Sequence, residues 1–249
     1  MFLPDTAHRP WPLPRRPWLL AMQWHDLLFM HWPVAPGVLR PLLPPTVALD
    51  TWDGSAWLGI TPLRMAGVRP RWLPPLPWLS AFPELNVRTY VTAQGKPGVW
   101  FLSLDAGNPL AVRGARAVFH LPYYDATMTV EWEGSAVRYR SKRTHRGAPS
   151  AAFIGRYQPC GPVAYAAVGS LAYWLTERYC LYASDRHGQL WRGDIHHARW
   201  PLQPAEADIV QNTLAEPLRL RLPADAPLLH FARRLDVVGW MLEAVETSS

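Results

Sequence analysis

The chain is poor in cysteine and lysine and has no long apolar run. Its two cysteines, Cys160 and Cys180, occur without secretory features, so we expect free thiols rather than a disulfide framework. Residues 1–20 contain five prolines and three arginines, which excludes the unbroken apolar stretch of a signal peptide. Nowhere do about 18 apolar residues follow one another, the length needed to cross a membrane. We therefore expect a soluble, cytoplasmic protein with no membrane partner.

Motifs for several common chemistries are also missing. The sequence contains no Gly-x-Ser-x-Gly, no glycine-rich phosphate loop, no cysteine pair and no His-Glu-x-x-His. His196 and His197 are adjacent, but neighbours on a strand face opposite ways and do not easily bind one ion. The usual hydrolase and nucleotide-binding signatures are thus absent, and we expect neither a metal nor a cofactor.

Positive charge is present but dispersed. The formal net charge is +6, and almost all the cations are arginines, the lysines being Lys96 and Lys142. The one dense basic run lies between Arg138 and Arg146, and we interpret it as a solvated strand edge. Since nucleic-acid binding needs cations clustered on one surface, we expect no DNA or RNA partner. A homo-oligomer agrees with the tryptophan-rich composition, but the sequence does not locate an interface.

Length and pattern predict a single α+β domain, mostly of antiparallel β structure. The 249 residues suffice for one large core. Residues 1–17, rich in proline and arginine, are expected to form an extended N-terminal arm, and residues 18–245 the domain. Residues 18–32 are apolar enough for a buried strand or a short helix, and periodicity does not decide between them. The other predicted elements are strands over 56–64, 84–93 and 98–104, hairpins over 127–141 and 179–195, a short helix after Pro36, and helices over 109–119, 170–178 and 205–214.

Residues 82–91 carry the strongest functional signal. Strand alternation places four polar side chains on one face and four mostly apolar ones on the other. The polar face is either a wet surface or the lining of a pocket, in which case the apolar face packs outward against helices. A mixture of acid, amide, guanidinium and phenol favours the pocket. There Arg88 would pair with a ligand carboxylate, and Glu84 would act as acceptor or general base.

A second polar group follows along the chain. It consists of Asp105, Arg113, Arg116, His120 and the pair Tyr123-Tyr124, and the two arginines are neighbours on one helix face. The favoured interpretation is a structural ion pair between Asp105 and one of these arginines. The functional alternative brings Asp105, Arg116 and Tyr123 to the ligand site.

Several short motifs occur in a characteristic order over about residues 20–240. They are Trp24-His25-Asp26, Leu42-Leu43-Pro44-Pro45, DTWDGSAWLG at 50–59, ELNVRTYV at 84–91, FLSLDA at 101–106, LPY at 121–123, TERY at 176–179 and LHFAR at 229–233. This order resembles the YqjF-like family, a bacterial family of unknown function. That family is similar in turn to the acetoacetate decarboxylase superfamily. The resemblance implies a cone-shaped β-barrel with a few flanking helices around a closed pocket, and places Glu84 at a glutamate that lines the decarboxylase pocket.

One departure from the decarboxylase pattern changes the expected chemistry. The decarboxylase forms a Schiff base through a lysine that follows a proline after the central helix. The matching stretch here, residues 120–125, reads HLPYYD and contains no lysine. Lys96 lies in a hairpin turn and Lys142 in the basic run. We therefore expect no Schiff-base decarboxylation.

Three functions remain open at this point. The first is a pocket protein that binds a small polar or carboxylate-bearing ligand. Its predicted ligand-binding residues are Glu84, Asn86, Arg88, Tyr90, Asp105, Arg116 and Tyr123. The second is an acid–base enzyme acting on a small carbonyl compound, with Glu84 as base and Arg88 or Tyr123 holding a developing oxyanion. The third is a scaffold without a ligand, whose polar face meets solvent or a partner.

Overall fold

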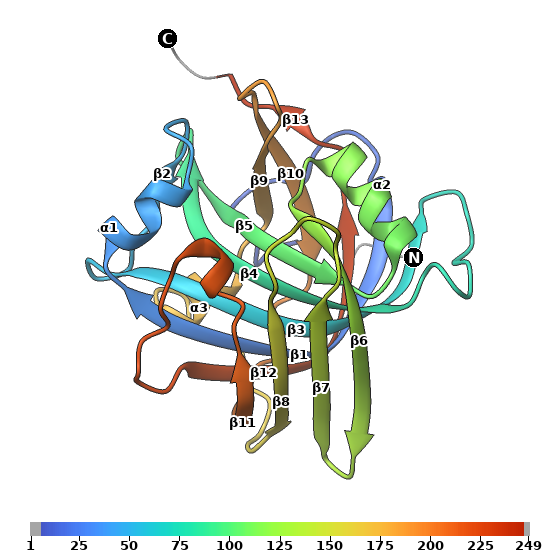
Figure 1. Ribbon diagram of the computed structural model, residues 1–249. Coiled ribbons are helices and arrows are strands. Elements are labelled where there is room, and N and C mark those ends of the chain that lie inside the picture. The colour runs from blue at the N-terminus through green and yellow to red at the C-terminus, as the bar shows by residue number, and fades with distance from the viewer. Residues whose placement is uncertain (1–5, 247–249) are drawn as a thin grey trace.

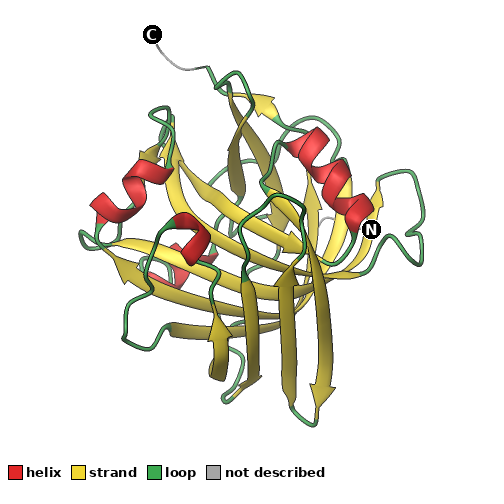
Figure 2. Ribbon diagram, in the orientation of Figure 1, coloured by secondary structure: helices red, strands yellow, loops and turns green. Residues whose placement is uncertain are grey.

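The computed structural model describes residues 6–246, so the first five residues of the predicted arm lie outside it. The strands are β1 (Leu20–Val34), β2 (Ala48–Leu49), β3 (Ala56–Pro70), β4 (Phe82–Ala93), β5 (Lys96–Ala106), β6 (Tyr123–Glu133), β7 (Ala136–Arg143), β8 (Ala152–Pro159), β9 (Cys180–Ser184), β10 (Leu190–His197), β11 (Gln203–Asn212), β12 (Leu228–Gly239) and β13 (Glu243–Ala244). The helices are α1 (Pro36–Leu39), α2 (Pro109–Phe119) and α3 (Leu171–Thr176), with 3₁₀ turns η1 (Arg40–Leu42) and η2 (Glu216–Leu218). Figure 2 shows that strands dominate and that the helices lie around the strand walls.

The sheet closes on itself twice, forming two ring-like walls that share β12, β1, β3, β4 and β5 (Figure 1). The small ring is completed by β9 and β10, and the large ring by β6, β7, β8 and β11. Pairing is antiparallel except where β5 meets β6 and β9, among the strands described. The predicted α+β class, mostly antiparallel, is thus confirmed, with a barrel as an approximate description of the walls.

The apolar face of β4 packs inside the large ring. Leu85 and Val87 join a core cluster with Tyr139 of β7 and Tyr157 of β8, all at most 1% exposed. The expectation that this face packs against helices is therefore wrong: the opposing layer is a sheet. Likewise β7, which carries much of the basic run, is not an edge strand, since β6 and β8 flank it.

Local sequence signals account for the helices. Asn108 caps α2, its Oδ1 accepting the amides of Leu110 and Ala111, and Ser170 caps α3 by accepting the amide of Tyr173. The helix predicted over residues 205–214 is wrong, because this segment forms β11. Its small side chains alternate toward the core, and pairing with β8 outweighs the helical propensity of alanine and glutamate.

The described part of the arm, residues 6–17, crosses the outside of β10. Arg9 donates to the carbonyl of Ile195 at 2.8 Å, and its guanidinium lies 4.5 Å from the ring centre of Tyr179. Trp11 is contacted by Lys96, whose Nζ lies 5.9 Å from the ring centre. No helix within residues 6–246 is both long and apolar enough to cross a membrane.

Candidate functional site

The polar side chains predicted on one face of β4 are buried inside the small ring. We call them the polar row: Glu84, Asn86, Arg88 and Tyr90. Glu84 is 4% exposed, Asn86 7% and Tyr90 0%, while Arg88 is partly buried. Because β4 lies between β3 and β5, hydrogen bonding on both edges fixes the direction of every side chain in the row. The row therefore does not form a wet outer surface.

Glu84 at one end of the row is paired with a tyrosine. The hydroxyl of Tyr123, at the start of β6, donates to Glu84 Oε2 at 2.8 Å. Burial raises the pKa of Glu84 from 4.5 to about 7, against the opposing effect of hydrogen bonds from Tyr123 and Asn86. A carboxyl group with such a pKa can both accept and donate a proton near neutrality.

The middle of the row holds buried polar atoms with unmet hydrogen-bonding capacity. Asn86 lies opposite Thr61 of β3, and both side chains are buried. Neither Asn86 Oδ1 nor Thr61 Oγ1 has a hydrogen-bond partner within residues 6–246. Such atoms are uncommon in protein interiors, where most buried polar groups are satisfied, so they mark a place where a polar ligand group would be stabilised.

Arg88 is the cation of the site. Its Nη2 donates to the Tyr90 hydroxyl at 3.4 Å, and its guanidinium carbon lies 5.2 Å from the ring centre of Phe29. Its Nε has no partner in the described chain, and none of the ion pairs found there involves Arg88. Opposite it stands Gly59, where a Cβ would come within 3.2 Å of both Arg88 Cγ and His31 Cδ2. Glycine therefore makes room for the side chains of Arg88 and His31.

His31 of β1 joins the other end of the row. Its Nε2 is hydrogen-bonded to the Tyr90 hydroxyl at 2.7 Å, and its Nδ1 has no partner in the part of the chain described. Burial, and then the positive charge of Arg88, lower the pKa of His31 well below its ordinary value of 6.5. His31 is thus neutral at pH 7 and can accept or donate one hydrogen bond at each ring nitrogen.

A second buried arginine closes this end of the small ring. Arg178 follows α3, pairs with Asp50 at 2.7 Å and donates to the carbonyl of Trp174 at 2.6 Å. Its guanidinium also lies 4.9 Å from the ring centre of Tyr90. Unlike Arg88, Arg178 already has a carboxylate partner, so its charge is compensated within the protein.

Two predicted site residues lie elsewhere. Asp105 pairs in register with Leu85, so its side chain faces the large ring, where it binds Arg143 at 2.8 Å. The expected pair with an arginine of α2 is thus wrong. Burial raises the pKa of Asp105 despite the opposing charge of Arg143. Arg116 is exposed; it donates to the backbone carbonyl of Tyr123 at 2.7 Å, and its guanidinium also lies near His145 and the ring of Tyr124, away from the polar row.

A cavity of about 270 Å³ adjoins the site. The strand β5 pairs with β9 at Val99 and Trp100 and with β6 from Leu104 onward. The cavity lies beside the stretch of β5 between these two pairings. Phe101 and Leu121 line the cavity, and these two side chains belong to one apolar cluster with Tyr123. Phe101 is also in register with Arg88 on the neighbouring strand. No member of the polar row lines the cavity, and Phe101 is the lining residue that is in register with one of them.

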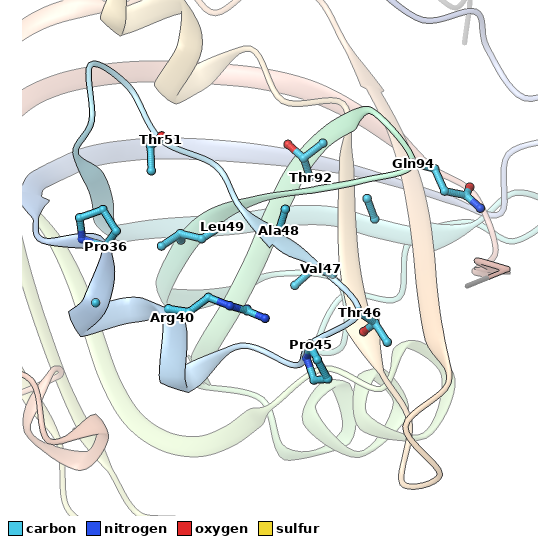
Figure 3. Close-up of a pocket in the computed structure, with 12 residues that line it drawn as sticks. Pro36, Arg40, Pro45, Thr46, Val47, Ala48, Leu49, Thr51, Thr92 and Gln94 are labelled. Carbon is cyan, nitrogen blue, oxygen red and sulfur yellow. The ribbon is translucent and has the colours of Figure 1, made fainter. Parts of the chain in front are cut away.

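A larger groove of about 740 Å³ is unrelated to the polar row. Figure 3 shows it between α1 and the end of β4, with Arg40, Thr92 and Gln94 at its walls. No member of the polar row lines it. Its position on the outer side of the edge strand β2 sets it apart from the site inside the small ring.

The two lysines lie away from the polar row. Lys96 is buried and forms an ion pair with Asp194 of β10, and Lys142 is exposed on β7. Position 123, within the stretch matching the decarboxylase lysine, places a tyrosine hydroxyl against Glu84. Within residues 6–246, no group of three or more His, Cys, Asp or Glu side chains is placed to hold a metal ion.

Three solved structures of proteins described as enzymes superpose on most of this chain. An enduracididine biosynthesis enzyme, MppR, complexed with pyruvate, superposes with a TM-score of 0.65 at 9% identity, covering 94% of this chain and 93% of MppR. Acetoacetate decarboxylase from Legionella pneumophila superposes with a TM-score of 0.62 at 15% identity, covering 96% and 93%. An acetoacetate decarboxylase-like enzyme from Sphingomonas wittichii gives 0.58 at 12% identity, covering 97% and 98%. The protein therefore has the acetoacetate decarboxylase-like fold.

Sequence comparison is more specific. The uncharacterized protein YqjF of Bacillus subtilis (strain 168) is 48% identical over 225 residues, which are 90% of this chain and 92% of YqjF. Residues 21–236 match DUF2071, a family described as an uncharacterized conserved protein. The chain belongs to the DUF2071 family, and the resemblance seen in its motifs is confirmed.

Proposed function

We propose that the protein binds a small carboxylate-bearing ligand inside the small ring, with Arg88 as its anion-binding residue. The observation that carries the proposal is that Arg88 faces the interior and has no carboxylate partner in the described chain. Removing a guanidinium from water is costly unless an anion or several hydrogen bonds compensate it. A ligand carboxylate bound by the guanidinium would provide both.

The neighbours of Arg88 favour a ligand with a second polar group. Within residues 6–246, the Thr61 hydroxyl, the Asn86 amide oxygen and His31 Nδ1 have no hydrogen-bond partner. A hydroxyl, carbonyl or amino group beside the carboxylate would satisfy them. Phe29, whose ring lies beside Arg88, would exclude water from the bound carboxylate and so strengthen the electrostatic interaction.

The cavity beside β5 supplies a route for such a ligand. Phe101 lines this cavity and is in register with Arg88, so a change of its side-chain rotamer would open the cavity toward the polar row. The cavity volume suits a molecule of a few heavy atoms rather than a nucleotide. Small keto acids fit this size, and the names of the structural relatives mention pyruvate and acetoacetate.

Calorimetric titration with pyruvate and with acetoacetate tests the proposal. We expect saturable binding and a rise in melting temperature, because a ligand at a hundred times its Kd stabilises the native state by about 2.7 kcal/mol. Methyl pyruvate, which lacks the anionic carboxylate, is the matched control ligand. Arg88→Ala should abolish binding, and Arg88→Lys should weaken it because lysine has no guanidinium fork. Arg140→Ala, on the exposed face of β7, is the control variant. Equal binding by Arg88→Ala would refute the assignment.

A second candidate is acid–base catalysis by Glu84 on a small carbonyl compound. The observation that favours it is the buried Glu84–Tyr123 pair, with a Glu84 pKa of about 7. The carboxylate would remove a proton from the carbon next to a ligand carbonyl, and the Tyr123 hydroxyl would stabilise the resulting oxyanion. Proton exchange of pyruvate in deuterated water, followed by NMR, should then occur with wild type and Glu131→Gln but not with Glu84→Gln. Binding without proton exchange would support the pocket protein without catalysis. The absence of both binding and exchange would support the scaffold without a ligand.

A further inference from the structure

An exposed apolar patch covers the loop between β3 and β4 and the start of α2. We call it the tryptophan patch: Trp72, Leu73, Leu76, Trp78 and Leu110. The two tryptophans are 74% and 71% exposed, and the leucines 45% to 56%. Figure 1 shows this loop extending from the strand walls beside α2. Because the largest exposed apolar patch of a protein is often a binding surface, this patch points to a partner.

The patch is held in one shape. Residues 70–77 contain four prolines, which restrict the backbone. The amide of Ser80 donates to the carbonyl of Leu76 at 2.9 Å, and Asn108 Nδ2 donates to the carbonyl of Trp78 at 3.2 Å. The second bond fastens the loop to the cap of α2. A surface ordered before binding loses little conformational entropy when a partner covers it.

Helix α2 extends the apolar surface. Of its residues only Val112 is buried, and its sequence combines apolar side chains with Arg113 and Arg116. Neither α2 nor residues 66–81 contain a lysine, aspartate or glutamate. Enrichment in tryptophan and arginine with depletion of lysine and acids is the composition of the core of a protein–protein interface.

We infer that the tryptophan patch is an isologous dimer interface, covered in solution by the same patch of a second copy. At up to about 250 Å² for a whole tryptophan, the exposed parts of Trp72 and Trp78 supply roughly 360 Å². The half-exposed leucines bring the patch to at least roughly 500 Å², so two copies would bury about 1,000 Å², the lower limit for a specific interface. Its five side chains are uncharged, so they can face their own copies without burying like charges. The nearest charges in the loop, Arg69 and Arg71, lie over the ring of Trp18, 5.7 and 5.1 Å from its centre, and so are directed at their own chain.

The same contacts argue against an anionic lipid surface as the occupant. Arginines that bind lipid headgroups extend from the apolar face into the headgroup layer. Here Arg69 and Arg71 are turned to Trp18 of their own chain, and Arg116 is held by the carbonyl of Tyr123. A dimer axis is also the commonest symmetry of protein assemblies.

Sedimentation velocity of the full chain, over loading concentrations from about 1 to about 200 µM, tests the interface. We expect a monomer–dimer equilibrium with a Kd on the order of 10 µM, as befits a small interface. The Trp72→Ser/Trp78→Ser variant should weaken it at least about 30-fold, since buried tryptophans dominate interface energetics. Leu73→Arg, which places like charges opposite each other, should do the same. Val168→Ser/Val210→Ser, which alters equally exposed residues elsewhere, is the control.

The outcomes separate the alternatives. A concentration-dependent dimer lost in both patch variants, with circular dichroism unchanged, would confirm the interface. A monomer at every concentration, or a dimer that persists in both variants, would overturn it. A vesicle assay tests the membrane alternative. If the protein sediments with vesicles of phosphatidylglycerol and phosphatidylcholine but not with phosphatidylcholine alone, and the patch variants do not sediment, the patch binds a membrane surface and the dimer interface is overturned. None of these results depends on the ligand proposed for the polar row.

Discussion

Replacing Glu84 by Gln should make the protein more stable at alkaline pH and leave it nearly unchanged at acidic pH. The carboxyl is buried beside Tyr123, and its pKa rises from 4.5 to about 7 on folding. The folded protein therefore holds this proton more tightly than the unfolded chain. The stabilisation that comes from the protonated Glu84 carboxyl is fully present below about pH 4.5 and is lost as the pH rises through about 7. At about 1.4 kcal/mol per pKa unit, the loss is on the order of 3 kcal/mol.

Urea unfolding of both proteins at pH values between about 5 and about 8 measures this difference. Protonated glutamate and glutamine have nearly the same shape, so their free energies of unfolding should agree near pH 5. By pH 8 the variant should be the more stable by up to about 3 kcal/mol. Glu131→Gln, an exposed acid on β6, corrects for the loss of one surface charge. A difference between wild type and Glu84→Gln that stays constant over this range would refute the assigned pKa and the buried carboxyl with it.

Three further predictions follow from single contacts. Tyr123→Phe removes a hydrogen bond that lowers the pKa of Glu84, so the same loss of stability should occur at higher pH; an unshifted titration would contradict the contact. Arg143→Met leaves Asp105 buried without its partner and should lower the free energy of unfolding in urea by about 3–5 kcal/mol. Adding Asp105→Asn should recover much of this loss. A loss below about 1 kcal/mol, as for an exposed ion pair, would count against the buried pair. Gly59→Ala places a methyl group 3.2 Å from two buried side chains and should destabilise the fold by about 1–3 kcal/mol, with neutrality in the same assay as the contrary result.

The alternation along residues 82–91 allowed the polar row to be predicted from sequence. A strand turns successive side chains to opposite faces, so the shared face of Glu84, Asn86, Arg88 and Tyr90 follows from spacing alone. The helix caps Asn108 and Ser170 and the hairpin turns are equally local, and the structure contains them. The local pattern did not exclude a solvent-exposed surface for the row, because the alternation of polar and apolar residues is the same whether solvent or protein covers the polar face.

Contacts between distant segments were beyond this reasoning. His31 lies 59 positions from Tyr90, in an apolar run that gives no sign of a hydrogen bond. Asp105 belongs to the opposite face of the sheet because of its register with β4, and its partner Arg143 is 38 positions away. The basic run around Arg143 predicts a solvated segment, but the ion pair with Asp105 buries Arg143 itself.

Sequence reasoning alone was enough for the alternation along β4, the caps of α2 and α3, the family and the absence of a lysine beside Pro122. These depend on neighbours within a few positions or on the order of motifs. The three-dimensional structure was needed to see that the sheet closes twice, that the polar row faces the small ring, and that Arg88 has no carboxylate partner within residues 6–246. Closure depends on which strands pair, and pairing is the sum of many weak long-range contacts that no local window contains.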